Sequence, residues 1–309
     1  MKRFLLQFGI FALAMAALLV LLIVTLPSSP TGYTREFFIK QRMMSDEERN
    51  PSIILLGGSN VAFGYNSPMI AERLQMPVIN VGLNAGVGLK LMVDESFPYL
   101  KKGDVLVFSP EYDHFFGLFA YGYLPLAEVF YQGKGECAAK MNLQQWRVVC
   151  RNMPMLLQKR VDYKIKSLFI PPEESSKVYQ VSSFNEYGDI VVREEQEPLR
   201  IPLKKEPPGN INREIIHWLE VKLMEISRKG VSVCMLPPIL ARTAYANKEV
   251  NIERVDSCLR KIGFPFICTP WEMTYPDSLF YDTFYHLDSL GVIIHTEDVI
   301  DLLKKRCEL

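Results

Sequence analysis

Ser59 and His286 are the side chains whose types and settings best suit covalent chemistry. Ser59 follows Gly57-Gly58 at the end of an apolar run, and a serine in such a strand-to-helix turn projects its hydroxyl from the edge of a sheet. His286 precedes the last predicted helix, and histidine is the usual base for a serine nucleophile near neutral pH. Asp282 lies four residues earlier, where it can orient the imidazole. The pattern predicts acyl transfer, although Gly-Gly-Ser turns and loop histidines also occur without chemistry.

Alternating apolar and amphipathic segments provide the scaffold for these residues. Short apolar runs predict strands, and longer segments with apolar residues every three or four positions predict helices. The predicted strands are residues 52–56, 78–81, 104–108, 231–236 and 264–268, and the predicted helices are residues 89–100, 211–229, 248–262 and 290–305, with a further helix starting at Ser67-Pro68. Continuously apolar strands that alternate with helices indicate a parallel sheet covered on both faces. We therefore expect an α/β fold with a doubly wound (flavodoxin-like) parallel sheet of about five strands, in three layers α/β/α.

Residues 111–210 interrupt this alternation and predict an insertion between the third and fourth strands. The insertion contains an aromatic-rich stretch from Tyr112 to Tyr131 and a predicted helix at 143–161. Loops at the carboxyl ends of parallel strands line the ligand crevice, so the insertion is a candidate lid or substrate-recognition element. A solvated decoration is the alternative. The aromatic side chains could stack on sugar rings or form the insertion's own small core.

Residues 4–26 are almost entirely apolar and follow Lys2 and Arg3. A helix of about 22 residues, at ~1.5 Å rise per residue, is long enough to cross a bilayer core. The positive-inside rule places its N-terminus in the cytoplasm and the rest of the chain outside, in the periplasm or at the cell surface. The predicted organisation is a cytoplasmic tip and transmembrane anchor in residues 1–30, a linker in 31–50 and one domain in 51–309. A cleaved signal peptide is the alternative to the anchor.

Composition excludes several other classes of protein. Lys plus Arg and Asp plus Glu number 35 each, so there is no overall basic charge for binding nucleic acid. The six cysteines form no C-x-x-C motif, which argues against zinc ribbons and thioredoxin-type chemistry. A disulfide is permitted outside the cytoplasm. The nearest pairs are Cys137 with Cys150 and Cys258 with Cys268, and the sequence does not choose between them.

Three segments resemble the ordered motifs of the SGNH (GDSL-like) hydrolases. Residues 54–61, Ile-Leu-Leu-Gly-Gly-Ser-Asn-Val, resemble the first block, with Gly58 where Asp is usual. Residues 78–86 resemble the second block, which donates a backbone N–H to an oxyanion. Residues 282–291 resemble the last block, which brings Asp and His together. The resemblance implies Ser59, His286 and Asp282 as the catalytic residues, and its implied oxyanion site consists of Ser59, Gly82, Asn84 and Gly86.

The third block departs from the family pattern. The family usually has Gly-x-Asn-Asp after the third strand, with the Asn amide in the oxyanion hole, whereas this chain has Pro110-Glu111-Tyr112-Asp113. Glu111 has no amide donor, and the Tyr112 hydroxyl is a candidate replacement. In the last block, Asp282 is four residues before His286 instead of the usual three. Residues 183–189 resemble a segment of the membrane-anchored branch found beside polysaccharide-modifying enzymes. The candidate substrate-binding residues are Asn60, Glu111, Tyr112 and Asn185.

The resemblance implies a membrane-anchored, extracytoplasmic serine esterase or O-acetyltransferase that acts on ester groups of a cell-envelope carbohydrate. The alternative is a catalytically inactive SGNH-like protein that binds glycan or scaffolds an acyltransferase complex. We expect no cofactor and no nucleic acid partner. The expected partners are the membrane, an acylated glycan and a membrane acyltransferase. Glu111, Asp113 and His114 are a low-ranked metal-binding candidate, because ligands so close in sequence rarely converge without others.

Overall fold

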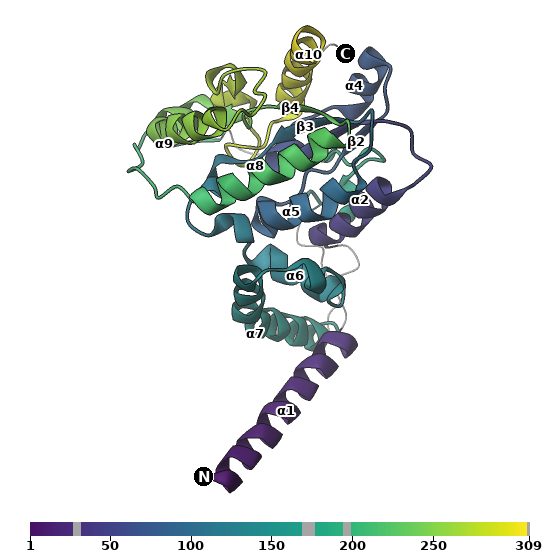
Figure 1. Cartoon of the computed structure of the whole chain (residues 1–309), viewed down its shortest axis with the longest axis vertical. Helices are drawn as coiled ribbons and strands as arrows, with labels where there is room; N and C mark the ends of the chain where they lie inside the picture. The colour runs from purple at the N-terminus through teal and green to yellow at the C-terminus, as the bar shows by residue number, and fades with distance from the viewer. Residues whose placement is uncertain (27–31, 169–176, 194–198, 308–309) are drawn as a thin grey trace.

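The computed structural model, which describes residues 1–26, 32–168, 177–193 and 199–307, places a parallel sheet between two layers of helices (Figure 1). The strands are β1 (Ile53–Gly57), β2 (Val78–Asn80), β3 (Val105–Ser109) and β4 (Ser232–Met235). They pair in the order β2-β1-β3-β4, and every pair is parallel. The strands that follow β1 in the chain lie on opposite sides of it, β2 on one side and β3 on the other. In open parallel sheets, ligands bind in the crevice at the carboxyl ends of the strands where the strand order reverses in this way.

Alternate side chains of the strands enter two separate cores. Ile53 and Leu55 of β1 belong to a core that also contains buried side chains of the fourth and last helices. Ile54 and Leu56 point to the opposite face, into a larger core that includes side chains of several other helices. Both faces of the sheet are therefore covered, as continuously apolar strands require. The predicted α/β class and the layered arrangement are confirmed.

Ten α-helices surround the sheet or extend from it in the described part of the chain: α1 (Lys2–Thr25), α2 (Glu36–Ser45), α3 (Ser59–Ala62), α4 (Ser67–Leu74), α5 (Leu89–Ser96), α6 (Leu124–Gln132), α7 (Leu143–Lys166), α8 (Arg213–Arg228), α9 (Arg242–Lys261) and α10 (Ser289–Arg306). Several begin at side-chain caps, which satisfy the free N–H groups of the first turn. Asn212 caps α8, and Asp288 caps α10 by accepting from the N–H of Gly291 at 2.7 Å. Asn66, the residue before Ser67, caps the start of α4 by accepting from the N–H of Met69.

Short 3-10 turns connect these helices and strands: η1 (Tyr33–Arg35), η2 (Ala85–Val87), η3 (Phe97–Tyr99), η4 (Tyr112–Phe115), η5 (Phe119–Tyr121), η6 (Glu136–Lys140), η7 (Val181–Ser183), η8 (Trp271–Met273) and η9 (Asp277–Leu279). A second, two-stranded parallel sheet joins β5 (Leu240–Ala241) to β6 (Thr274–Tyr275). The sequence did not predict this small sheet.

The prediction of a fifth strand in the main sheet is wrong, because residues 264–268 make only one bridge to β4. Phe266 pairs in parallel with Met235. The Met235 N–H donates to the carbonyl of Pro265 at 3.0 Å, and its carbonyl accepts from Ile267 at 3.1 Å. Pro265 has no N–H to continue the ladder, which is why proline rarely lies inside a sheet. The main sheet of the described residues therefore has four strands.

The predicted insertion leaves and re-enters the sheet domain at one stem. Phe116 and Ile211 form an antiparallel bridge, the Asn212 N–H donates to the carbonyl of Phe115 at 2.8 Å, and Gly117 donates to Asn210 at 3.2 Å. Beyond the stem, α6 and α7 pack together between the sheet domain and α1 (Figure 1). Four of the eight Phe and Tyr residues of the predicted Tyr112–Tyr131 stretch are buried in the core: Tyr112, Phe115, Tyr121 and Tyr131.

A second part of the insertion, residues 177–193, returns to the sheet. The Asn80 N–H at the end of β2 donates to the carbonyl of Tyr187 at 2.8 Å, and the Ile190 N–H donates to Ala62 at 2.9 Å. The Asp189 carboxylate accepts from the Ser67 hydroxyl at 2.6 Å. This segment thus lies against the carboxyl ends of the strands, next to α3.

The segment predicted as a linker contains α2, which packs against the domain. Phe37 and Met44 of α2 are buried in the larger core. Between them, the buried ammonium of Lys40 donates to the carbonyls of Gly82 at 2.6 Å and Gly188 at 2.7 Å. Burial lowers the pKa of Lys40 to about 8, against the opposing charge of Glu36. The domain boundary predicted at residues 30 and 31 lies outside the described residues.

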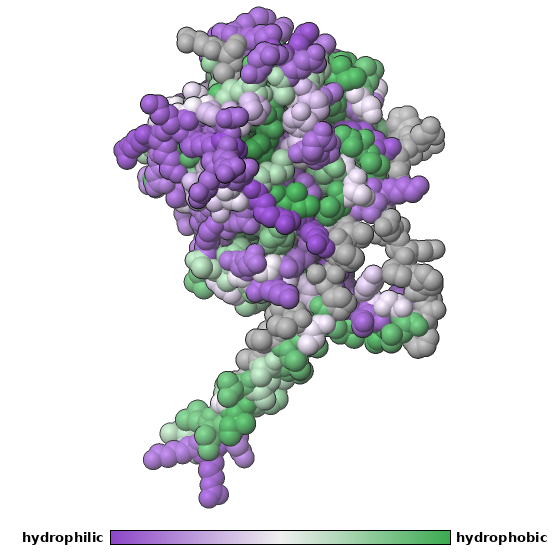
Figure 2. Space-filling view, turned by 90° about the vertical axis from the view of Figure 1, so that its right-hand side faces the viewer, coloured by the Kyte–Doolittle hydropathy of each residue, from purple (hydrophilic) through white to green (hydrophobic). Residues whose placement is uncertain are grey.

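The first helix projects from the domain and carries exposed apolar side chains above a hydrophilic tip (Figures 1 and 2). Phe4, Leu6 and Leu13 are each more than half exposed, at 67%, 66% and 73%. Among the described residues, however, no helix has the combination of length and apolarity needed to cross a membrane. The predicted transmembrane helix is therefore not supported.

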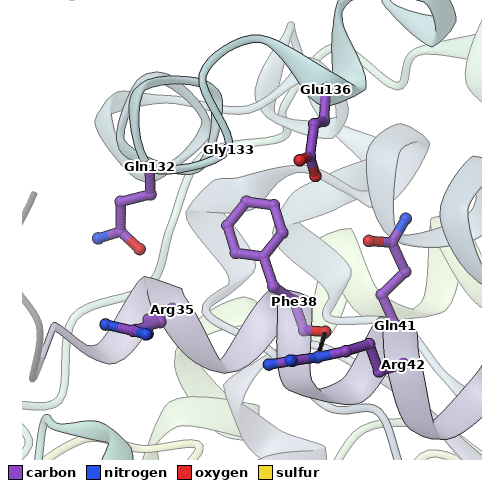
Figure 3. A pocket seen from close by; sticks show the side chains of 7 residues that line it. All are labelled: Arg35, Phe38, Gln41, Arg42, Gln132, Gly133 and Glu136. Atoms are coloured by element: carbon purple, nitrogen blue, oxygen red, sulfur yellow. Dashed lines mark hydrogen bonds between the residues drawn. The ribbon is translucent and has the colours of Figure 1, made fainter. Parts of the chain in front are cut away.

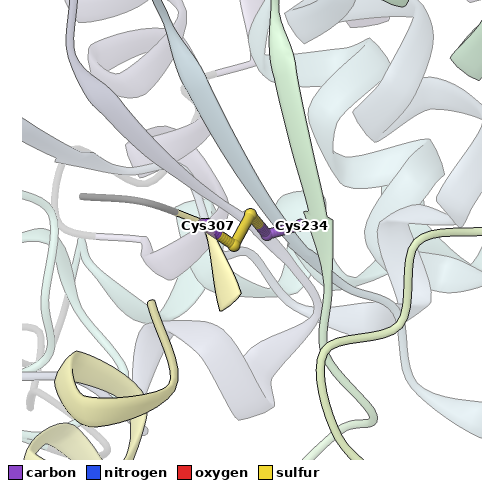
Figure 4. The surroundings of a disulfide bond; sticks show 2 residues. All are labelled: Cys234 and Cys307. Carbon is purple, nitrogen blue, oxygen red and sulfur yellow. A yellow bond between two sulfur atoms is a disulfide. The ribbon is translucent and has the colours of Figure 1, made fainter. Parts of the chain in front are cut away.

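A disulfide joins Cys234 in β4 to Cys307, directly after α10 (Figure 4). Cys137, Cys150, Cys258 and Cys268 are free. Neither pair of cysteines that are near in sequence is bonded. The bond forms instead between elements that share one core, since Cys234 and Leu303 of α10 are buried in the same cluster.

Candidate functional site

Ser59 lies where the sequence predicts it, at the first residue of α3 and directly beyond β1 and Gly58. The side chain is partly buried. Its hydroxyl donates to Oε1 of Glu111 at 3.0 Å. The N–H of Asn60 donates to the same carboxyl oxygen at 3.2 Å. The candidate nucleophile is thus paired with the acidic residue of the altered third block.

Glu111 is buried, with 4% of its surface exposed. Burial, together with the smaller effect of the nearby Asp113 charge, raises the pKa of Glu111 to about 7. Hydrogen bonds from the backbone of Asn60 and from the hydroxyl and backbone of Ser59 act in the opposite direction. The carboxyl group can therefore gain or lose a proton near neutral pH, which an ordinary glutamate does not do.

His286 and Asp282 form the predicted pair. The Nδ1 atom of His286 lies 2.7 Å from Oδ1 of Asp282. A closed turn holds the two residues, with the Tyr281 N–H donating to the carbonyl of His286 at 2.7 Å. This turn accommodates the spacing of four residues. The imidazole lies flat on the ring of Phe63, with centroids 3.9 Å apart and planes 6° apart.

Phe63 connects the pair to the turn that carries the candidate nucleophile. It follows the last residue of α3, and its N–H donates to the carbonyl of Ser59 at 2.9 Å. His286 therefore lies against the same short helical turn that Ser59 begins. Among the described residues, Ser59 Oγ is hydrogen-bonded to Glu111, and no hydrogen bond joins it to His286.

Tyr179 is a site residue that the sequence did not predict. Its hydroxyl donates to Oδ2 of Asp282 and lies 3.3 Å from Nδ1 of His286. Its ring packs near Phe63 and Tyr33, with centroid distances of 5.8 and 5.7 Å. Tyr179 comes from the insertion, where it follows no helical or strand periodicity that would mark it. The insertion thus contributes directly to the site.

Two of the N–H groups predicted as oxyanion donors, those of Gly82 and Gly86, are occupied in this structure. The Gly82 N–H donates to Oδ1 of Asn80 at 2.9 Å, and the Gly86 N–H donates to Oδ1 of Asn84 at 2.8 Å. Asn84 accordingly caps the turn at η2. Residues 81–86 form a loop after β2, and the amides of both glycines have side-chain partners next to them in the chain. An oxyanion would have to displace these side chains to use them.

Of the other candidate substrate-binding residues, Asn60 and Asn185 have structural partners. The buried Asn60 amide donates to the carbonyl of Ser109 at 3.0 Å and so ties α3 to the end of β3. Asn185 stabilises its own turn, because its Oδ1 accepts from the N–H groups of Tyr187 and Asp189. Tyr112 is buried, and its hydroxyl has no hydrogen-bond partner among the described residues. The side chains of these three residues form no hydrogen bond with the Ser59 hydroxyl, which is bonded to Glu111.

The candidate metal ligands of the third block diverge. Asp113 forms an ion pair with Lys248 at 2.8 Å, and His114 Nε2 lies 3.0 Å from the carbonyl of Ala85. Within the described ranges, no group of three or more His, Cys, Asp or Glu side chains is arranged to hold a metal ion. His114 instead fixes the second-block loop.

Two cavities lie outside the contacts of the Ser59 hydroxyl. One of about 400 Å³ is found between α2 and the insertion (Figure 3). It is lined by Arg35, Phe38, Gln41, Arg42, Gln132, Gly133 and Glu136. The other, of about 280 Å³, includes Tyr112, Asp113 and Lys248 in its wall. This second cavity borders Tyr112 and Asp113, the two residues that directly follow Glu111.

No protein-family model matches the chain, and no curated protein matches it as a relative. The proposed resemblance to SGNH hydrolases is therefore argued from the sequence motifs of this chain.

Proposed function

We propose that this protein is an SGNH-like serine esterase or O-acetyltransferase that acts on ester groups of a cell-envelope carbohydrate. Ser59 is the nucleophile that forms an acyl-enzyme, which is then released to water or to a sugar hydroxyl. His286, oriented by Asp282, moves protons to and from the substrate oxygens. Serine enzymes need this combination of nucleophile, titratable base and orienting group.

The observation that carries the proposal is the convergence of two distant segments at one turn. His286 is bonded to Asp282 at 2.7 Å and stacked on Phe63, which closes the helical turn begun by Ser59. A surface histidine would not need both a carboxylate partner and a flat aromatic support. The ring is only 6% exposed, so its orientation is fixed by these contacts.

Placement outside the cytoplasm, on a membrane, is part of the proposal. It is supported by the exposed apolar side chains of α1, by Lys2 and Arg3 at its start, and by the bond between Cys234 and Cys307, since disulfides persist in oxidising compartments. The test is extraction of isolated membranes with alkaline carbonate. Release of the full chain into the soluble fraction would contradict the membrane attachment.

A catalytically inactive SGNH-like protein that binds glycan or scaffolds a membrane acyltransferase is the second candidate. It is favoured by the occupied amides of Gly82 and Gly86. The hydrogen bond from Ser59 to Glu111 favours it as well. In such a protein, these contacts would simply stabilise the loops around a ligand site.

The experiment that separates the candidates is labelling of the purified full chain with a fluorophosphonate, together with hydrolysis of p-nitrophenyl acetate. We expect labelling at Ser59, and loss of labelling and turnover in Ser59→Ala. His286→Ala should lose turnover by about 10²–10⁴-fold, the usual contribution of a positioned acid or base. Ser227→Ala, which changes an exposed serine on α8, is the matched control and should match the wild type. A folded wild type that reacts with neither reagent would favour the inactive candidate.

A further inference from the structure

The proposed function leaves open which group removes the proton of the nucleophile. We propose that Glu111 is the general base for Ser59, while His286 serves the substrate oxygens. This inference rests on the proposed function and adds a catalytic residue to it. The family pattern that the chain resembles would place an amide donor near this position, so the assignment comes from the contacts of this chain alone.

The first argument is distance. A general base must lie within about 2.6–3.2 Å of the atom whose proton it takes. Glu111 Oε1 lies 3.0 Å from Ser59 Oγ, so the proton can pass directly between them. His286 Nδ1 is bonded to Asp282, and in the described residues the imidazole has no hydrogen bond to Ser59.

The second argument is that neighbouring residues leave space for the Glu111 carboxyl group beside Ser59 and hold the two segments together. A Cβ atom at Gly58 would lie 2.4 Å from Oε1 and 2.8 Å from Cδ of Glu111, so the carboxyl group occupies the space that a side chain at position 58 would need. The Asn60 amide donates to the Ser109 carbonyl at 3.0 Å, two residues before Glu111. This bond ties the turn of the nucleophile to the strand end that carries the base.

The third argument is charge. A base works best when its pKa is close to the working pH, and burial raises that of Glu111 to about 7. Asp113 raises the pKa of Glu111 as well, and its effect is moderated because Asp113 is paired with Lys248. The buried hydroxyls of Tyr33 and Tyr285 also face the charge of Glu111. Near pH 7 the carboxyl group is therefore partly ionised and able to accept a proton.

The proposed steps balance as follows. The Ser59 O–H bond breaks and its proton moves to Oε1 of Glu111. The electron pair left on Oγ forms a bond to the ester carbonyl carbon, and the carbonyl π pair moves to oxygen. His286 enters the cycle as the imidazolium paired with Asp282, and when the intermediate collapses the leaving alcohol oxygen takes this proton and leaves His286 neutral. Water or a sugar hydroxyl then gives a proton to His286 and attacks the acyl group, and the departing Ser59 oxygen recovers its proton from Glu111.

The test compares labelling rates of the full chain with a fluorophosphonate, whose fluoride leaving group needs no proton. Glu111→Gln preserves shape but cannot accept the proton, and we expect labelling of Ser59 to slow by about 10²–10⁴-fold. His286→Ala should slow labelling much less, while still losing ester turnover. Glu128→Gln, at a partly buried glutamate of α6 whose pKa burial also raises, is the matched control and should label at the wild-type rate.

The pH dependence gives a second readout that does not depend on comparing folded fractions. Wild-type labelling should rise with pH to a plateau with a midpoint near 7, and this rise should disappear in Glu111→Gln. Labelling of Glu111→Gln at or above the wild-type rate, with loss of labelling in His286→Ala, would make His286 the base and overturn the inference. A wild type that is never labelled at Ser59 would remove the proposed function, and this inference with it.

Discussion

Tyr179 offers a direct test of whether the insertion takes part in the reaction. Its hydroxyl donates to Asp282, which is the partner of His286. Although burial raises the pKa of Asp282, hydrogen bonds from His286 and Tyr179 hold it below its ordinary value. Tyr179→Phe removes one of these bonds and keeps the ring that packs near Phe63 and Tyr33. In this variant, Asp282 still pairs with the imidazole of His286, but the hydrogen bond from Tyr179 no longer holds the carboxylate in place.

The size of the effect follows from the type of bond and its exposure. A hydrogen bond to a charged group contributes about 1.5–3 kcal/mol. Tyr179 is 38% exposed, so water replaces part of the lost bond and the lower end of this range applies. At about 1.4 kcal/mol for each factor of ten, we expect kcat/KM for an acetyl ester to fall roughly tenfold.

The assay is hydrolysis of p-nitrophenyl acetate by the purified full chain, measured as kcat/KM across the neutral pH range. Tyr163→Phe is the matched control, because Tyr163 on α7 is also 38% exposed and makes no contact with the pair. A Tyr179→Phe variant with wild-type kcat/KM, in a background where Ser59→Ala is inactive, would refute the reasoning. The insertion would then only cover the site.

Three further predictions concern stability. Arg49→Met removes the cation that is bonded to the fully buried Asp104 carboxylate at 2.7 Å, and should lower the free energy of unfolding in urea by about 3 kcal/mol. Cys307→Ser opens a disulfide that spans 73 residues, and chain entropy gives a loss of about 4 kcal/mol. Burial lowers the pKa of His114 and of His295 from 6.5 to about 4, so the unfolded chain takes up protons that the folded chain excludes. Unfolding measured at decreasing pH should therefore show stability falling between about 6.5 and 4, by up to about 3 kcal/mol for each histidine.

Each of these predictions has a matched control or an opposing outcome. Cys150→Ser changes an exposed free cysteine and should leave the unfolding midpoint unchanged. A loss below about 1 kcal/mol for Arg49→Met would mean that the pair acts as an exposed ion pair. Stability that is constant from pH 7 to pH 4 would contradict the burial of the two histidines as neutral groups.

The sequence predicts the sheet well, because its strands are short apolar runs that end at Gly, Pro or Ser. β1 and β3 lie within one residue of the predicted ranges. The prediction of a fifth strand is wrong because Pro265 has no N–H group and cannot continue the hydrogen bonding to β4. The α2 helix is hidden from pattern analysis because two of its buried residues are the charged Glu36 and Lys40, and Lys40 is bonded to carbonyls far away in the chain.

The candidate site is predicted in part. Ser59, Asp282 and His286 can be found because their types and positions at strand or helix ends are informative. The role of Glu111 depends on burial and on the space left at Gly58, neither of which a single sequence reveals.

The stem formed by Phe116 and Ile211 has a consequence for how this protein can change. The chain leaves and re-enters the sheet domain at neighbouring positions. The segment between them can therefore be lengthened, shortened or exchanged without changing the order of the strands. The constraint on such exchange is the stretch at 177–193, which reaches back to β2 and supplies Tyr179. A chimaera that keeps this stretch and replaces α6 and α7 would keep the proposed nucleophile Ser59 and the groups proposed to transfer its protons, while changing the surface around them.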